Sequence, residues 1–187
     1  RVDHRAEIGP LPKVYIGRTP SYLQDLDDRT VVIETDHVHS GYMAANHLLE
    51  RGCRRILFPT RRPLATNLLQ GREKGFSRAL IEHGIENPEA YMVIVNGLKE
   101  EHGYRSAIGC MRALIEGGIS IPEQVRVLGH DDTLFARYNL KRLSSIRDPL
   151  ESFCDLAIDS LVSMMEGQKP EKNHYVLQGR VIRRETT

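Results

Sequence analysis

Short apolar runs of β-favouring residues alternate with amphipathic helical stripes along this 187-residue chain. The runs are the right length for buried strands and lie at residues 14–16, 31–33, 56–58, 91–95, 125–128 and 174–177. Between them, apolar residues recur at helical spacing, as in Gly41, Ala44, Ala45, Leu48 and Leu49. This alternation predicts an α/β fold with doubly wound parallel sheets, because parallel strands need helical crossovers between them.

Composition excludes several classes of protein. The formal net charge of +1 indicates neither a nucleic-acid surface nor a mimic of a polyanion. The apolar runs are short, and the N-terminal residues lack the apolar segment of a secretory signal, so we expect a cytoplasmic protein without a membrane span. Cys53, Cys110 and Cys154 have no metal-binding spacing, which favours reduced thiols, and no cofactor is expected.

An acidic pair follows the strand predicted at residues 125–128. Gly129 ends that strand, so Asp131 and Asp132 fall at its carboxyl end, where open α/β sheets bind their ligands. The alternative is a solvated acidic turn that caps the next helix. The residues alone leave both interpretations open.

Several ordered blocks resemble one known family. They are a D-G-A-A-H-L-G pattern within residues 36–52, R-x-x-G-F at 72–76, G-x-D-D at 129–132, L-S-S-I-R-D-P at 143–149 and the terminal segment 181–187. Together they are similar to the effector-binding domains of LacI/GalR-family bacterial transcriptional regulators. The resemblance implies a type I periplasmic-binding-protein-like fold of two doubly wound, Rossmann-like lobes, with the N-terminal lobe incomplete in this chain.

The family pattern also implies how the chain divides and what it does. Residues 1–53 with 149–167 would form the N-terminal lobe, and residues 54–148 with 168–187 the C-terminal lobe. A sugar or related small metabolite would bind between the lobes and control DNA binding by an N-terminal module that is absent from this chain. Lobe closure around the ligand would be the signal.

The resemblance assigns roles to five residues. Arg72 occupies the position of the family's effector-binding arginine, whose planar fork grips hydroxyls or a carboxylate, and Asp131 would accept hydrogen bonds from the ligand. Asp148 stands where many relatives carry glutamine, although it could instead cap the following helix. Phe58 and Thr60, at the end of another strand, are expected to line the cleft. For Arg72, the alternative is a solvated helix arginine.

Periodicity and resemblance disagree over residues 104–118. Apolar residues there share one face of a single helix, whereas the family has a strand and a ligand-contacting loop after the helix that begins near Tyr104. A doubly wound lobe needs a strand between successive helices. We therefore expect a break between Tyr104 and Ile108.

Two other functions are compatible with the pattern. A solute-binding protein of a sugar transporter would have the same fold, and the His37-Val38-His39 spacing is one that metal-dependent hydrolases use. The regulator is preferred, which implies a non-enzyme that forms a homodimer on two-fold operators. The expected dimer surface carries Met111, Leu114, Ile115, Phe135 and Tyr138.

Overall fold

The computed structural model describes residues 11–17, 26–60, 67–94 and 100–187. The chain forms two compact units. Unit 1 comprises Arg1–Thr35 with Pro149–Leu177, and unit 2 comprises Asp36–Asp148 with Gln178–Thr187. In the part of the chain that is described, no helix is both long enough and apolar enough to span a bilayer.

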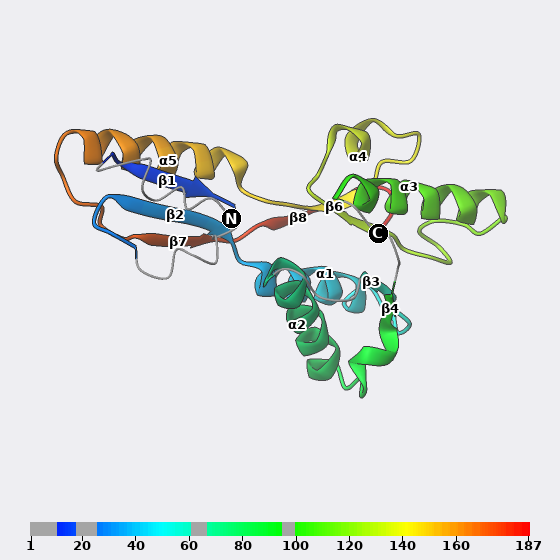
Figure 1. Ribbon diagram of the computed structural model, residues 1–187. Coiled ribbons are helices and arrows are strands. Elements are labelled where there is room, and N and C mark those ends of the chain that lie inside the picture. Colours follow the sequence, from blue (N-terminus) through cyan, green and yellow to red (C-terminus); the bar gives the residue numbers. More distant parts are fainter. Residues whose placement is uncertain (1–10, 18–25, 61–66, 95–99) are drawn as a thin grey trace. The chain divides into compact units, whose positions relative to one another are not determined.

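Unit 1 is a parallel sheet covered by one long helix. Strands β1 (Lys13–Ile16), β2 (Thr30–Thr35) and β7 (His174–Leu177) pair in the order β1-β2-β7, all parallel. Helix α5 (Leu150–Met165) lies over one face of this sheet (Figure 1). The core between them consists of Val31, Ile33, Phe153, Ala157 and Met164. Burial of the central strand explains its uninterrupted apolar sequence.

The first half of unit 2 joins a helix pair to a small sheet. Helices α1 (His37–Leu49) and α2 (Asn67–Glu82) pack together, and strand β3 (Phe58–Thr60) pairs in parallel with β4 (Met92–Ile94). The short helix η1 (Pro88–Tyr91) leads into β4. The core here contains Ala45, Leu49, Ile56, Phe76, Ala79 and Leu80.

The second half of unit 2 holds a separate sheet. Strand β5 (Leu128–His130) is parallel to β6 (Ser144–Arg147), which is antiparallel to β8 (Arg180–Ile182). Helices α3 (Glu100–Glu116) and α4 (Leu134–Tyr138) complete this half. Its core contains Met111, Ile121, Ala136 and Leu143.

The two units differ from the division expected from the sequence. Residues 36–53 were expected in the N-terminal lobe, but α1 packs on α2 and so belongs to unit 2. Residues 168–177 were expected in the C-terminal lobe, but β7 extends the sheet of unit 1 by pairing with β2. Strand pairing and helix packing decide membership, and neither can be read from the local periodicity of one segment.

The expected break between Tyr104 and Ile108 is wrong, because α3 runs continuously from Glu100 to Glu116. Its apolar stripe has a packing partner, since Met111 is buried and Ala107 and Leu114 pack against the same core. The continuous helix leaves no strand between Tyr104 and Ile108 to join the two sheets of unit 2. Among the described residues, the β3-β4 pair and the β5-β6-β8 sheet are not hydrogen-bonded to each other. Unit 2 therefore has two small sheets where one continuous parallel sheet was expected.

Two glycines let α1 and α2 approach closely. A Cβ at Gly41 would overlap the backbone carbonyl oxygen of Arg72, and a Cβ at Gly75 would overlap the carbonyl oxygen of Val38. Since both clashes are with backbone atoms, no side-chain rotation relieves them. The crossing fixes the position of the α2 segment that carries Arg72.

We predict that Gly75→Ala lowers the free energy of unfolding by about 1–3 kcal/mol or more, because the helices must separate to admit a methyl group. The matched control is Gly109→Ala in α3, where the added Cβ meets no atom within 4 Å. That substitution should leave stability unchanged or raise it by about 0.5–1 kcal/mol. Urea unfolding of both variants measures the difference. Equal effects of the two substitutions would contradict the close crossing.

Candidate functional site

Four polar side chains of unit 2 gather from three parts of its sequence. Arg72 comes from α2, His130 ends β5, Asp131 begins the turn after it, and Asp148 follows β6. The Arg72 Nη2 lies 3.2 Å from His130 Nδ1, and that nitrogen lies 2.7 Å from Asp131 Oδ1. His130, Asp131 and Asp148 each offer one ligand atom within 4.8 Å of the others. We call these four residues the polar cluster.

The turn after β5 has an unusual backbone. Asp131 and Asp132 have φ angles of 73° and 43°, in the left-handed region that most non-glycine residues avoid. Two residues before Asp131, a Cβ at Gly129 would lie 2.8 Å from Leu143 Cδ2, so a larger residue there would require the Leu143 side chain to move.

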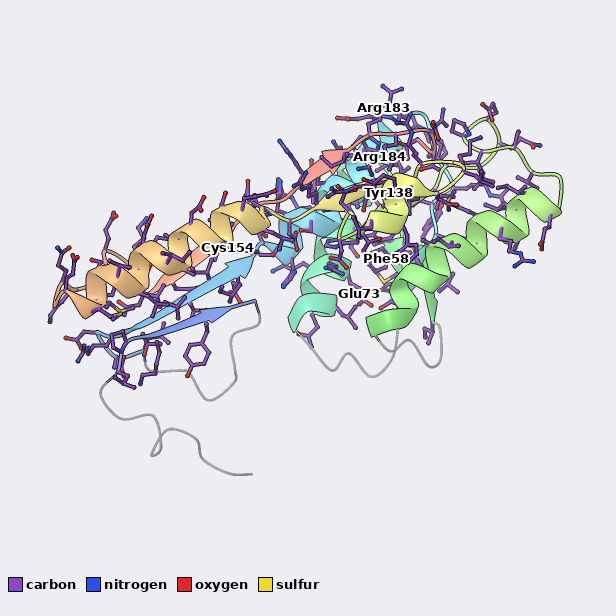
Figure 2. All side chains as sticks on the ribbon, turned by 90° about the horizontal axis from the view of Figure 1, so that it is seen from above. Phe58, Glu73, Tyr138, Cys154, Arg183 and Arg184 are labelled. Carbon is purple, nitrogen blue, oxygen red and sulfur yellow. The ribbon has the colours of Figure 1, made fainter. Side chains whose placement is uncertain are left out.

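Asp132 is the anchor of this turn. Its buried carboxylate forms ion pairs with Arg184 at 2.6 Å and with Arg137 at 3.2 Å, and its backbone N–H donates to Ser145 Oγ at 3.0 Å. Figure 2 labels Arg184 beyond the end of β8. Three elements, α4, β6 and the segment after β8, thus hold Asp132 in place. Asp131, the next residue back, is left exposed.

The polar cluster has a defined protonation pattern. The hydrogen bond from His130 holds the pKa of the Asp131 carboxyl below its ordinary value, and the positive charge of Arg72 acts in the same direction. Ionised Asp131 can only accept, so the 2.7 Å contact requires a proton on His130 Nδ1. Arg72 can only donate, so it finds no acceptor at that protonated nitrogen. Its guanidinium is left with hydrogen-bonding capacity that the cluster does not use.

Three atoms of the cluster are buried without a hydrogen-bond partner among the described residues. They are Arg72 Nε, His130 Nε2 and Asp148 Oδ1. Burial lowers the pKa of the Arg72 guanidinium, while the charges of Asp131 and Asp148 oppose that effect. Buried polar groups are normally paired, and each unpaired one costs about 1–3 kcal/mol. An arrangement of this kind is suited to a polar ligand that completes the missing hydrogen bonds.

Comparison with known proteins identifies the family of the domain. The periplasmic binding protein-like domain matches residues 45–187, more than half of the chain. The chain belongs to the periplasmic binding protein-like domain family. Its relatives include the transcriptional repressor PurR of Escherichia coli, which is 28% identical over 179 residues. The match covers 84% of this chain and 52% of PurR. The chain thus spans about half the length of the curated relatives it matches.

Two solved structures of regulators extend the comparison. The Escherichia coli transcriptional repressor AscG is 25% identical with a TM-score of 0.78, covering 97% of this chain and 71% of its own. A LacI-family regulatory protein from Chloroflexus aggregans is 26% identical with a TM-score of 0.77, and the match covers 94% of this chain and 68% of that protein's chain. These likenesses confirm the fold class and the resemblance to LacI-family effector-binding domains that were expected from the sequence.

The structure of this periplasmic binding protein-like domain brings together three of the five candidate residues. Arg72, Asp131 and Asp148 all belong to the polar cluster. The N-cap of α5 is Pro149, so the alternative role of Asp148 as a helix cap is not observed. His130 was not a candidate, because a histidine between a glycine and two aspartates has no spacing signal of its own.

Phe58 and Thr60 lie outside the polar cluster. The ring of Phe58 lies 4.9 Å from that of Phe76, centroid to centroid. Thr60 is buried and donates a hydrogen bond from its hydroxyl to Glu73. Figure 2 labels Phe58 and Glu73. These contacts pack both residues into unit 2, and their role in lining a ligand cleft stays a prediction.

The His37-Val38-His39 pattern lies in the first turn of α1, where Asp36 accepts a hydrogen bond from the backbone N–H of His39 and caps the helix. Residues two apart on a helix do not face each other, so the two imidazoles are not presented to one metal ion. The only metal-compatible group found among the described residues is His130, Asp131 and Asp148. The geometry therefore does not favour the metal hydrolase.

A buried chain of hydrogen bonds joins α1, β6 and the C-terminal residues of unit 2. His47 Nε2 lies 2.9 Å from Thr187 Oγ1, and Thr187 donates to Ser144 Oγ at 2.8 Å. Thr186 accepts from the Ser144 backbone N–H and donates to the carbonyl of Val127. Burial, with the charges of Arg51 and Arg183, lowers the pKa of His47 to about 4. The imidazole is therefore neutral at pH 7.

We predict that His47 makes the domain less stable in acid. Its pKa is lower in the folded chain than in the unfolded chain, so stability falls as the pH drops from about 6.5 to about 4 and levels off below that. The loss is on the order of 2–3 kcal/mol. His47→Gln keeps a donor without a titrating group, so its unfolding free energy should fall less across that window. Identical pH profiles of the two proteins would contradict the assignment.

Proposed function

We propose that this domain senses a sugar or related small polar metabolite through Arg72, His130, Asp131 and Asp148. The observation that carries the proposal is the set of buried unpartnered atoms on three of these side chains. A ligand with hydroxyl groups both donates and accepts, so it can pair the Arg72 donors and the carboxylate acceptors at once.

We further propose that ligand binding controls DNA binding by a separate N-terminal module of a cytoplasmic transcriptional regulator. Support comes from the relatives, since PurR and AscG are transcriptional repressors. A solute-binding protein of a transporter is the rival function of the same fold. The relatives named do not favour it, and either a signal peptide or a DNA-binding motif on the same polypeptide would separate the two functions.

A thermal-shift screen of neutral sugars and nucleobases against the purified chain tests the sensing function. For any ligand found, we predict that Arg72→Lys and Asp131→Asn each weaken binding roughly tenfold or more. Lysine keeps the charge of Arg72 but loses the planar fork, and asparagine removes the acceptor charge of Asp131. Isothermal titration calorimetry measures the change in Kd.

Matched controls are available on the same chain. Arg78→Lys alters an exposed arginine of α2 whose partner is Glu82, and Asp159→Asn alters an exposed residue of α5. Both controls should bind as the unaltered protein does. Undiminished affinity in both cluster variants, or a screen that finds no ligand, would contradict the proposed sensing site.

We also propose that the domain forms homodimers. Of the five residues expected at the interface, Met111 is buried in the core and Leu114 packs against it. Ile115, Phe135 and Tyr138 remain exposed, at 56%, 60% and 81%. Leu134 and Leu140, close in sequence to Phe135 and Tyr138, are also exposed. Large apolar and aromatic side chains gathered on a surface favour association, and this supports α4 as the centre of the interface.

Light scattering after size exclusion should therefore give a dimer. The double substitution Phe135→Ser with Tyr138→Ser should give a folded monomer, because both side chains are exposed in the single chain. Its Tm should fall only by the stabilisation that dimerisation provides. Ile81→Ser, at an exposed position of α2, should remain dimeric. A monomeric unaltered protein, or a double variant that still dimerises, would exclude this interface.

A further inference from the structure

The polar cluster has more negative than positive charge. It contains the carboxylates of Asp131 and Asp148 and the guanidinium of Arg72, whose pKa responds to both carboxylates. The two carboxylates and the one guanidinium sum to one negative charge. His130 donates a hydrogen bond to Asp131, and the positive charge of Arg72 also stabilises the Asp131 carboxylate. Asp148 has no hydrogen bond to its buried Oδ1.

The unpartnered atom of Asp148 is an acceptor, because the oxygen of an ionised carboxylate only accepts. His130 Nε2 and Asp148 Oδ1 are both buried and unpaired. One part of the cluster thus requires hydrogen-bond donors, while Arg72 requires an acceptor.

The sum of charges separates four kinds of ligand. A neutral polyol would leave one carboxylate of the cluster without a compensating charge, and an anion would add a second excess negative charge. A divalent metal ion would leave one excess positive charge, with the Arg72 guanidinium only 3.2 Å from the His130 ring. A ligand with a single positive charge would compensate Asp148, whose Oδ1 is buried and unpaired, and buried uncompensated charge is costly.

We propose that the ligand of this site carries a protonated amino group on a hydroxylated scaffold, as an amino sugar does. The ammonium donates to Asp148 Oδ1, while a ring or hydroxyl oxygen accepts from Arg72 Nε. Asp148 is then the residue that selects the amine over its neutral counterpart. This inference rests on the proposed sensing function, and it names the chemical class of the ligand.

Matched sugar triplets test the inference by isothermal titration calorimetry. The probes are glucose, glucosamine and glucose 6-phosphate, with the corresponding compounds of galactose and mannose, at about pH 6.5 so that the amine is protonated. In at least one triplet, the amino sugar should bind roughly tenfold or more tighter than the neutral sugar. The 6-phosphate of the same sugar should bind weakest of the three.

Variants assign the preference to one residue. Asp148→Asn keeps the shape of the side chain but removes its charge, so the preference for the amino sugar should largely disappear while binding of the neutral parent changes little. The control Asp155→Asn, at an exposed position of α5, should keep the full preference. A preference that survives in Asp148→Asn would overturn the role of Asp148.

Other outcomes overturn the ligand class. Tighter binding of a neutral sugar or a sugar phosphate would contradict the charge argument and leave the sensing function intact. Stoichiometric binding of Zn²⁺ alone, lost in Asp148→Asn, would make the cluster a metal site. If no probe of the triplets binds, the inference fails, and the sensing function survives only where the wider screen of neutral compounds has yielded a ligand.

Discussion

The buried carboxylate of Asp132 is the interaction on which the candidate site depends. Its ion pairs with Arg137 and Arg184 join α4 to the segment after β8, and its backbone N–H is held by Ser145 of β6. Removing one partner of a buried ion pair typically costs several kcal/mol, because the remaining charge is left uncompensated. With Asp132 held inward in a left-handed conformation, its neighbour Asp131 projects outward towards His130 and Arg72.

The two sides of the site are positioned by different physical means. The ion pairs of Asp132 hold the left-handed turn at the end of β5. The α2 side is positioned by close packing, since Gly41 and Gly75 permit the helix crossing that places Arg72. The R-x-x-G-F block therefore combines three functions. Arg72 belongs to the polar cluster, Gly75 permits the crossing, and Phe76 fills the core.

Much of this could be predicted from the sequence, for identifiable reasons. The apolar runs located β2, a central parallel strand that is buried, and the edge strand β7, and the motifs located Arg72, Asp131 and Asp148. The unit to which α1 and β7 belong could not be predicted, because it depends on pairing between distant segments. The role of His130 was also hidden, since it arises only when β5 and α2 come together. Phe58 and Thr60 were candidates because they end a strand, yet their contacts lie in the core.

The central claim is that Arg72, His130, Asp131 and Asp148 form one ligand-binding site. A crystal structure of the domain with a ligand from the binding screens tests it most directly. We expect ligand polar atoms within hydrogen-bond distance of Arg72 Nε and Asp148 Oδ1, the atoms that are unpartnered without the ligand. A ligand bound elsewhere, with these atoms still unpaired, would contradict the proposed site.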